Sequence, residues 1–425
     1  MTKHECGDQY YMNIRERVSR RWLLILKTML VTGSLVLVGG IVGRQVSSQG
    51  YPEAPTGFDN QTNGMVEQVT FSQDRELFEK RDTIEDGLGP VYNAQSCVEC
   101  HQNMVSGGGS QILVVRAGHL ENGEFVDAPG GSLINDRAID PSLQEYVPPG
   151  ETIRAQRISL STLGDGYIEA IDDQTLLDIA ARQPGQSKGA IAGQAILVPI
   201  LESPGATRVG RFGWKSQHAS LLSFTADAYL NEVGITSRLE PVENSSLGRS
   251  VAAFDKVADI EDSDNDIDNI ARFMRATKAP APDSSLAQSG EARQGGQLFN
   301  QIGCAICHVP TIVTGAPGKP TNGGTYIVPA ALGNKVIHPY SDFLLHNVGT
   351  GDGIVQNGGR ETANKMRTPP LWGFRTRNRF MHDGQSFTPE EAIRRHGGEA
   401  GMVTSRFNQL GNRQKSQLIT YLRSL

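Results

Sequence analysis

The chain contains the five-residue pattern C-x-x-C-H twice, once in each half. This pattern is the attachment sequence of a c-type haem. The spacing has a chemical reason, because residues three apart lie on one face of a helical turn, where both thiols can bond one haem. The histidine that follows then offers an imidazole ligand to the iron. We therefore predict two covalently bound haem c groups, attached through Cys97, Cys100, Cys304 and Cys307.

The residues that follow the cysteines, His101 and His308, are the predicted proximal iron ligands. Of the five cysteines, only Cys6 lies outside the two blocks. Two Cys-x-x-Cys pairs could also build a Cys₄ zinc ribbon, but a ribbon does not require a histidine after each pair. A thioredoxin-like pair is disfavoured because no βαβ pattern surrounds either block, and a disulfide within a pair would close only a tiny loop.

Length and composition set broad limits on the fold and on the partners. A chain of 425 residues is expected to form two to three domains. The net charge of −6 gives no basic footprint for nucleic acid, so we expect no nucleic-acid partner. With 48 glycines and 21 prolines, long loops are expected.

Residues 22–43 are apolar, and Lys27 is their only charged residue. As a helix this segment would be about 33 Å long, which is enough to cross a bilayer. Arginines are more frequent before the segment than after it, so residues 1–21 are predicted to be a cytoplasmic tail and the remainder to lie on the periplasmic side of the inner membrane. An uncleaved membrane anchor and a cleaved export signal both remain open.

The remaining chain divides by composition into a linker at 44–66, an N-terminal haem c domain with insertions at 67–280, and a C-terminal cytochrome c-like haem domain at 281–425. Helices are expected at 74–80, 175–182, 216–233, from the acidic run through residue 275, from residue 290 and at 413–425, and strands at 112–116 and 191–201. A helix that leads into C-x-x-C-H, with a closing C-terminal helix, is typical of cytochrome c. The predicted fold is mainly α, with two cytochrome c-like domains, long loop-rich insertions, a few short strands, and an N-terminal transmembrane or signal helix.

Several longer blocks carry a resemblance to a known family. The chain resembles the bacterial di-haem c-type oxidoreductases and di-haem peroxidases, formerly called thiol oxidoreductase-like, which are related to di-haem cytochrome c peroxidase, MauG and rubber oxygenase. The resemblance covers roughly residues 66–425. The matching blocks are residues 87–97, 163–171, 210–215, 340–346, 366–373, 380–384 and 395–400.

The resemblance implies further site residues. Met366 resembles the distal ligand of the high-potential haem in the peroxidase relatives, with His382 and His346 as alternatives. Glu169 is implied as the acid–base group near the first haem, since peroxide cleavage needs a group that moves a proton between the two oxygens. Trp214 is implied as an electron or hole carrier between the haems.

Each of these residues also has a plain structural interpretation. Met366 could be a packing residue of a core, Glu169 a solvated residue of a helix, and Trp214 a core aromatic. His119 could cap the first haem iron, or it could be an ordinary surface histidine.

These observations favour a periplasmic di-haem peroxidase. The N-terminal haem would reduce hydrogen peroxide with electrons relayed by the C-terminal haem. The expected donor is a small redox protein, a cytochrome c or a cupredoxin, or a quinol-linked chain. Two alternatives stay open: a non-enzymatic electron-transfer cytochrome, and an oxygenase or MauG-like enzyme that oxidises an organic or protein substrate.

Overall fold

Helices and short antiparallel strands both contribute to the fold. The structure is a computed structural model, and it describes residues 50–425. The α-helices are α1 (Gln68–Glu79), α2 (Asp165–Glu169), α3 (Asp173–Ser187), α4 (Leu221–Ala228), α5 (Asp266–Ala276), α6 (Ser284–Ala287), α7 (Gly290–Ile302), α8 (Pro389–Arg394), α9 (Gly401–Gln409) and α10 (Asn412–Ser424).

The strands are mostly two or three residues long. They are β1 (Val91–Tyr92), β2 (Leu113–Glu121), β3 (Glu124–Asp127), β4 (Leu133–Ile134), β5 (Arg137–Ala138), β6 (Ile153–Ile158), β7 (Leu197–Pro199), β8 (Thr207–Val209), β9 (Ile312–Val313), β10 (Pro320–Thr321), β11 (Tyr326–Ile327), β12 (Val336–Ile337), β13 (Leu345–His346) and β14 (Met366–Arg367). In the largest sheet β2 pairs antiparallel with β3, β4 and β6.

The prediction of a mainly helical fold is therefore correct only in part, because the fold is mixed. The sheet built on β2 is larger than the short strand expected at 112–116. The strand is longer than the sequence pattern predicts because β6 pairs with β2 at six positions, from Ile158 opposite Leu113 to Ile153 opposite Gly118. Long-range pairing of this kind leaves little trace in the sequence of either strand alone.

The predicted helices are confirmed in position more closely than in length. The last helix, α10, matches the expected 413–425, and α7 begins at the expected residue 290. The helix expected at 216–233 begins only at Leu221, where the Ser220 hydroxyl caps it by accepting from the backbone N–H groups of Leu222 and Ser223. The acidic run places Asp266 and Asp268 in the first turn of α5, where the helix dipole favours negative charge.

The largest buried cluster joins both sides of the predicted domain boundary at 280/281. It combines Phe71 and Phe273 with residues from the later part of the chain, such as Leu332, Phe343 and Trp372. Residues from both predicted haem domains therefore pack into one hydrophobic core. The division into two domains stays a prediction.

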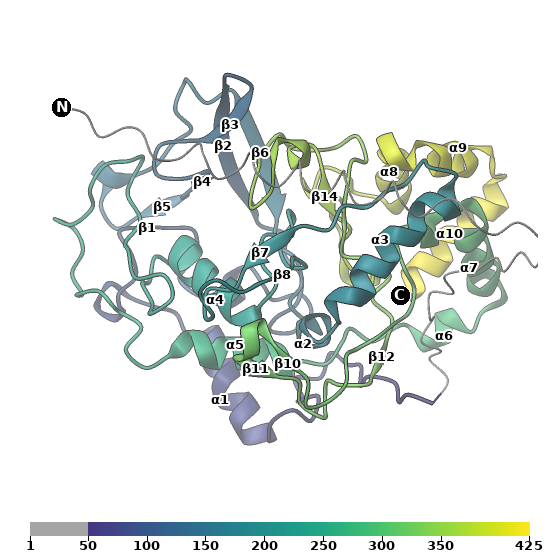
Figure 1. The fold of residues 1–425 in the computed structure, drawn as a ribbon, viewed down its shortest axis with the longest axis horizontal. Coiled ribbons are helices and arrows are strands. Elements are labelled where there is room, and N and C mark those ends of the chain that lie inside the picture. The colour runs from purple at the N-terminus through teal and green to yellow at the C-terminus, as the bar shows by residue number, and fades with distance from the viewer. Residues whose placement is uncertain (1–49) are drawn as a thin grey trace, which may run out of the picture. The chain divides into compact units, whose positions relative to one another are not determined.

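A second cluster surrounds the later C-x-x-C-H block, and α7 and α10 form its base. Figure 1 shows α7 beside α10, with α8 and α9 close by. The two helices approach closely at Gly295, where a Cβ atom would lie 2.0 Å from the carbonyl oxygen of Gln417. Only glycine permits this spacing, and it brings Phe299 and Leu418 together in the core.

Residues 50–66, the described part of the predicted linker, run as extended chain against the body. Ala54 N–H donates to Val336 O at 2.9 Å, and Asn63 donates to the carbonyls of Arg275 and Thr277. The predicted membrane or signal segment at 22–43 and the tail at 1–21 lie outside the described residues. Within residues 50–425, no helix is both long enough and apolar enough to cross a membrane.

Candidate functional site

Each C-x-x-C-H block lines a large cavity of its own. The C-terminal cavity contains Cys304, Cys307 and His308 and has about 1510 Å³ of empty space, part of it open to solvent. The N-terminal cavity contains the first block, residues 97–101, and has about 1420 Å³ measured in the same way. The cysteines at the described positions are free thiols. Because the two pairs line separate cavities, they do not assemble a Cys₄ zinc ribbon.

Both blocks adopt the same local fold. A 3₁₀ turn covers Cys97–Glu99 in the first block and Cys304–Ile306 in the second. In each block the histidine N–H donates to the carbonyl of the first cysteine at 3.0 Å. In the second block this turn follows α7 directly, because Gly303 takes a left-handed conformation (φ 104°) that glycine adopts readily. The two thiols and the histidine are thereby presented to one side.

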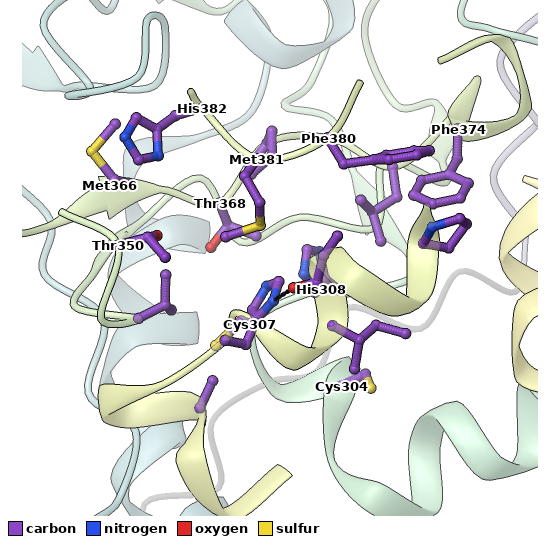
Figure 2. Close-up of a pocket in the computed structure, with 18 of the residues that line it drawn as sticks. Cys304, Cys307, His308, Thr350, Met366, Thr368, Phe374, Phe380, Met381 and His382 are labelled. Atoms are coloured by element: carbon purple, nitrogen blue, oxygen red, sulfur yellow. Dashed lines mark hydrogen bonds between the residues drawn. The ribbon is translucent and has the colours of Figure 1, made fainter. Parts of the chain in front are cut away.

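The second block's histidine is arranged as a metal ligand. His308 Nδ1 lies 3.0 Å from Tyr340 O, so it donates its proton there and leaves Nε2 with a free lone pair. Burial lowers the pKa of His308 to about 4, which keeps the ring neutral, the form that binds a metal. Figure 2 shows His308 in the pocket together with Cys304 and Cys307.

A second histidine of the C-terminal cavity, His396, faces His308. Their ring centres are 6.4 Å apart. A bond from a metal to an imidazole nitrogen is about 2.0–2.1 Å long, and the ring centre lies about 1 Å further, so two imidazoles on one ion have centres about 6 Å apart. His396 Nδ1 contacts Ala392 O at 2.7 Å, which again leaves Nε2 free. The separation of the two rings therefore fits two imidazole ligands of a single metal ion.

The first block's histidine has a different environment. His101 Nδ1 is buried and has no hydrogen-bond partner among residues 50–425. Burial lowers the pKa of His101 to about 4, so this ring is also neutral. Among the described residues that line the N-terminal cavity, His101 is the only histidine. An orphaned ring nitrogen beside two free thiols in a large cavity fits a haem for which His101 would be a ligand. Tyr229 and Met274 line the same cavity.

One wall separates the two cavities. Its residues line both of them, and they are Ile158, Ser159, Leu160, Ser161, Trp214 and Arg367. Trp214 is 8% exposed, and its indole N–H donates to Ile158 O at 2.7 Å. The expectation that Trp214 lies between the two sites agrees with this placement. Its role as an electron carrier stays a prediction.

A buried cation holds this wall in place. Lys215 Nζ donates to the carbonyls of Thr362, Ala363 and Lys365 at 2.8–2.9 Å. It also lies 3.4 Å from a carboxylate oxygen of Asp352, and the same carboxylate pairs with Arg157. The residue after Trp214 is thereby fixed to the loop that leads into β14.

The Glu169 carboxylate is engaged elsewhere than at the cavities. It is fully buried and takes two hydrogen bonds from Arg275, at 2.6 and 2.9 Å. Leu221 N–H and Asn322 Nδ2 also donate to it. Burial alone would raise the pKa of Glu169, but the charge and hydrogen bonds of Arg275 hold it below its usual value. Glu169 lines neither cavity, and its contacts connect α2, α4 and α5.

One helical turn earlier, Asp165 lines the N-terminal cavity. This carboxyl group is 7% exposed, and burial raises its pKa to about 7, against the opposing charge of Arg367. The sequence analysis named Glu169 in the block 163–171, and the structure places Asp165 of the same block in the cavity. Positions 165 and 169 lie on the same face of a helix, so spacing alone gives them the same rank.

The three predicted distal ligands, Met366, His382 and His346, all line the C-terminal cavity, and they differ in their contacts. Met366, in β14, is 5% exposed and packs with Ile158 and Trp214. Figure 2 shows Met366 next to His382, away from Cys304, and the ring of His382 lies edge-on to Trp214 at 6.0 Å. His346 has a carboxylate at each ring nitrogen, that of Asp342 at Nε2 and that of Glu399 at Nδ1.

His119 lies outside both cavities. It belongs to β2, its side chain is about one-third exposed, and its Nδ1 contacts Glu151 at 2.9 Å. It lines neither cavity. The surface interpretation of His119 therefore agrees with the structure better than the capping one.

Residues 148–425 match the family model described as "Di-haem oxidoreductase, putative peroxidase". The chain belongs to the di-haem oxidoreductase family. The matched residues include the second C-x-x-C-H block and begin after the first. Membership implies two haem groups, and this di-haem oxidoreductase has one cavity with cysteines and histidine for each.

Three solved structures are similar to the di-haem oxidoreductase at low identity. Hydrazine synthase of Kuenenia stuttgartiensis has a TM-score of 0.41 and 13% identity, over 94% of this chain and 100% of that one. A MauG-like protein associated with microbial copper homeostasis has a TM-score of 0.39 and 16% identity, over 88% and 92%. A variant of the diheme peroxidase BthA from Burkholderia thailandensis has a TM-score of 0.36 and 12% identity, over 84% and 86%. Among curated proteins none matches the chain.

Proposed function

We propose that this di-haem oxidoreductase is a c-type peroxidase that reduces hydrogen peroxide at the N-terminal cavity with electrons taken up at the C-terminal cavity. The observation that carries the proposal is the difference between the two cavities. Two facing histidines, His308 and His396, suit a six-coordinate iron that exchanges electrons. The N-terminal cavity has His101 as the one histidine of its described lining, together with the carboxyl of Asp165, and this suits an iron with an open position for a small oxidant.

The free thiols support covalent attachment of both haems. Cys97 and Cys100 would hold one haem, with His101 as a ligand, and Cys304 and Cys307 would hold the other, with His308 as a ligand. A bound haem supplies one-electron chemistry at each site. The two free thiols on one side of each 3₁₀ turn support this assignment.

On the distal side of the second site we propose His396 in place of Met366. The 6.4 Å spacing of the rings favours His396, whereas Met366 packs into the wall with Trp214. Met366 and His382 remain the candidates if the histidine is excluded by experiment.

The proton chemistry would fall to Asp165. Reducing one peroxide molecule to two waters consumes two electrons and two protons. The Asp165 carboxyl, with a pKa of about 7, can accept a proton from the near oxygen and return it to the far oxygen at neutral pH. The guanidinium of Arg367 lines the same cavity, where its charge favours a negatively charged oxygen. The catalytic role predicted for Glu169 has weaker support, because its carboxylate is occupied by Arg275.

Trp214 belongs to the wall between the two cavities and would carry electrons from one to the other. The donor would be a small redox protein, a cytochrome c or a cupredoxin, or a quinol-linked chain. The apolar segment at 22–43 supports a periplasmic position, either anchored or exported.

The test is a visible and EPR spectrum of the purified protein, together with its intact mass and its reaction with peroxide. We expect a mass increase of two haems, one low-spin and one high-spin ferric signal, and rapid reoxidation of the half-reduced protein by hydrogen peroxide. Two low-spin signals and no peroxide reaction would favour an electron-transfer cytochrome. A high-spin signal without a peroxide reaction would favour an oxygenase or a MauG-like enzyme. A colourless protein would overturn all three.

A further inference from the structure

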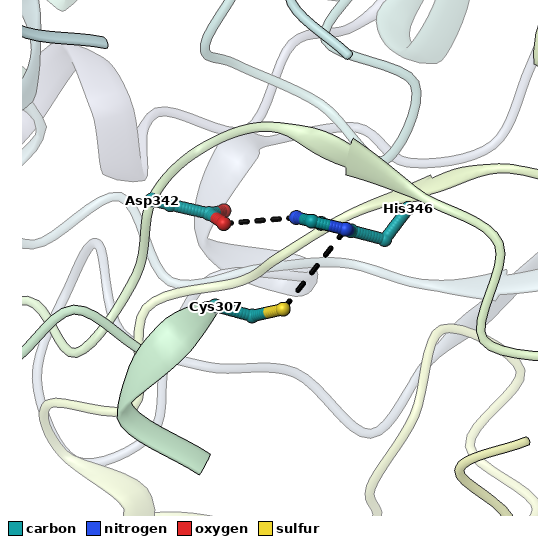
Figure 3. A group of neighbouring side chains, drawn as sticks. All are labelled: Cys307, Asp342 and His346. Atoms are coloured by element: carbon teal, nitrogen blue, oxygen red, sulfur yellow. Dashed lines mark hydrogen bonds and ion pairs between the residues drawn. The ribbon is translucent and has the colours of Figure 1, made fainter. Parts of the chain in front are cut away.

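A buried histidine beside the second C-x-x-C-H block has a carboxylate at each ring nitrogen. His346 is 2% exposed in its side chain, its Nε2 lies 2.8 Å from Asp342 and its Nδ1 lies 2.8 Å from Glu399. Both nitrogens can face carboxylate oxygens at this distance only if both carry protons, so the ring is an imidazolium. Figure 3 shows His346 between Asp342 and Cys307.

The first carboxylate belongs to the side of the cavity that holds the proximal ligand. Asp342 follows Tyr340 by two residues, and the carbonyl of Tyr340 accepts the proton of His308 Nδ1. Gln183 donates to both Asp342 and the carbonyl of Ile306, so the loop is fixed to the C-x-x-C-H turn itself. Asp342 is therefore rigidly connected to the proximal histidine.

The second carboxylate belongs to the opposite side. Glu399 follows His396 by three residues, with Gly397 and Gly398 between them. Two glycines give the chain little stiffness of its own. On its α8 side the segment is held by His396 itself, whose N–H donates to Ile393 O and whose Nδ1 contacts Ala392 O. Beyond the histidine it is held by Gly397 N–H, which donates to Val348 O, and by Glu399, which accepts from the N–H groups of Ala192 and Asn347 and contacts His346.

We infer that His346 and Glu399 are positioning residues that hold His396 at its ligating distance from His308. The inference rests on the proposed ligand role of His396. The imidazolium attracts both carboxylates at once, so it ties the loop of each histidine to a common point beside Cys307. Hydrogen bonds to charged groups are worth more than neutral ones. Removing the Glu399 charge should therefore release the distal loop while His308 stays in place.

The test uses carbon monoxide on the reduced holoprotein, because it binds only a haem with an open or displaceable position. The wild type should bind one molecule per chain, at the N-terminal haem. Glu399→Ala removes three hydrogen bonds to a carboxylate, from Ala192, His346 and Asn347. It should raise the binding to two, with a shift of at least about 10- to 100-fold in the ligation equilibrium, which is the effect of losing one such charged hydrogen bond. The EPR spectrum of the oxidised variant should gain high-spin signal at the expense of low-spin signal.

Three further variants separate the possible outcomes. Glu390→Ala is the matched control, since Glu390 is a partly exposed residue of α8 that pairs with Arg394, and it should bind one molecule. Glu399→Gln keeps the size of the side chain and carries the test if the alanine variant does not fold. His396→Ala should bind two molecules. If His396→Ala still binds one, the ligand assignment fails. If it binds two while both Glu399 variants bind one, His396 is the ligand and the positioning role is overturned.

Discussion

Replacing Asp165 with Asn should abolish most of the peroxide reaction while leaving both haems bound. A general acid–base group contributes about 10²–10⁴-fold to a rate, so reoxidation of the half-reduced protein by peroxide should slow by that factor in a stopped-flow experiment. Asn is close in shape to Asp, so the substitution keeps the lining of the cavity and removes only the ability of residue 165 to take up and release a proton.

The same substitution should also change how the free energy of unfolding depends on pH. Burial raises the pKa of Asp165 from 3.8 to about 7. Between these values the folded protein holds a proton that the unfolded chain has released, so the stability contributed by this site is present below pH 4 and decreases as the pH rises to 7. Asn cannot ionise and removes that slope. Asp165→Asn should therefore be more stable than the wild type at pH 8, by an amount on the order of a few kcal/mol.

Glu169→Gln is the matched comparison, because the two acids are one helical turn apart. Its carboxylate pairs with Arg275, whose side chain is 11% exposed, and removing one partner of a buried ion pair costs about 3–5 kcal/mol. Urea unfolding should show this loss, whereas the rate with peroxide should stay near that of the wild type. A slow peroxide reaction in Glu169→Gln, with a normal rate in Asp165→Asn, would refute the assignment and return the role to Glu169.

Three other substitutions test separate parts of the structure. Cys97→Ser should leave one covalent haem bond at the first site, and haem staining after denaturing electrophoresis together with the intact mass should show whether that haem is retained or lost. Gly295→Ala places a Cβ atom 2.0 Å from Gln417 O, so it should lower the free energy of unfolding by about 1–3 kcal/mol in urea titrations; an unchanged midpoint would mean that α7 and α10 can separate freely. Lys215→Met leaves Asp352 with Arg157 alone and strands three buried carbonyls, so it should destabilise by about 3–5 kcal/mol, and a neutral result would show that water replaces the ammonium.

The sequence predicted those features that depend on residues close together in the chain. The C-x-x-C-H turns and the helices α7 and α10 depend on residues within a few positions of each other, and they are found as expected. The four-stranded sheet was missed in extent because β2 and β6 pair over a long separation.

The distal side of each cavity could not be predicted for a related reason. His396 comes to His308 from the end of α8, 88 residues further along the chain, and the sequence does not indicate where that helix packs. Asp165 and Glu169 are four residues apart in α2, so spacing alone treats them alike, and only tertiary packing shows that Glu169 pairs with Arg275 while Asp165 lines the cavity. His396 lies in the block 395–400, which resembles the family. The resemblance of that block alone did not indicate that His396 could be a ligand.

The contacts of residues 50–66 have a consequence for the order in which the protein can fold. Asn63 donates to carbonyls 212 and 214 residues further along the chain, at Arg275 and Thr277. These hydrogen bonds of Asn63 therefore cannot form until more than half of the protein has been synthesised. The cavity around Cys97 is likewise lined by residues as late in the chain as Pro370. Non-local closure of this kind is slow, and during that delay the first pair of thiols stays accessible to whatever attaches a haem to the unfolded chain.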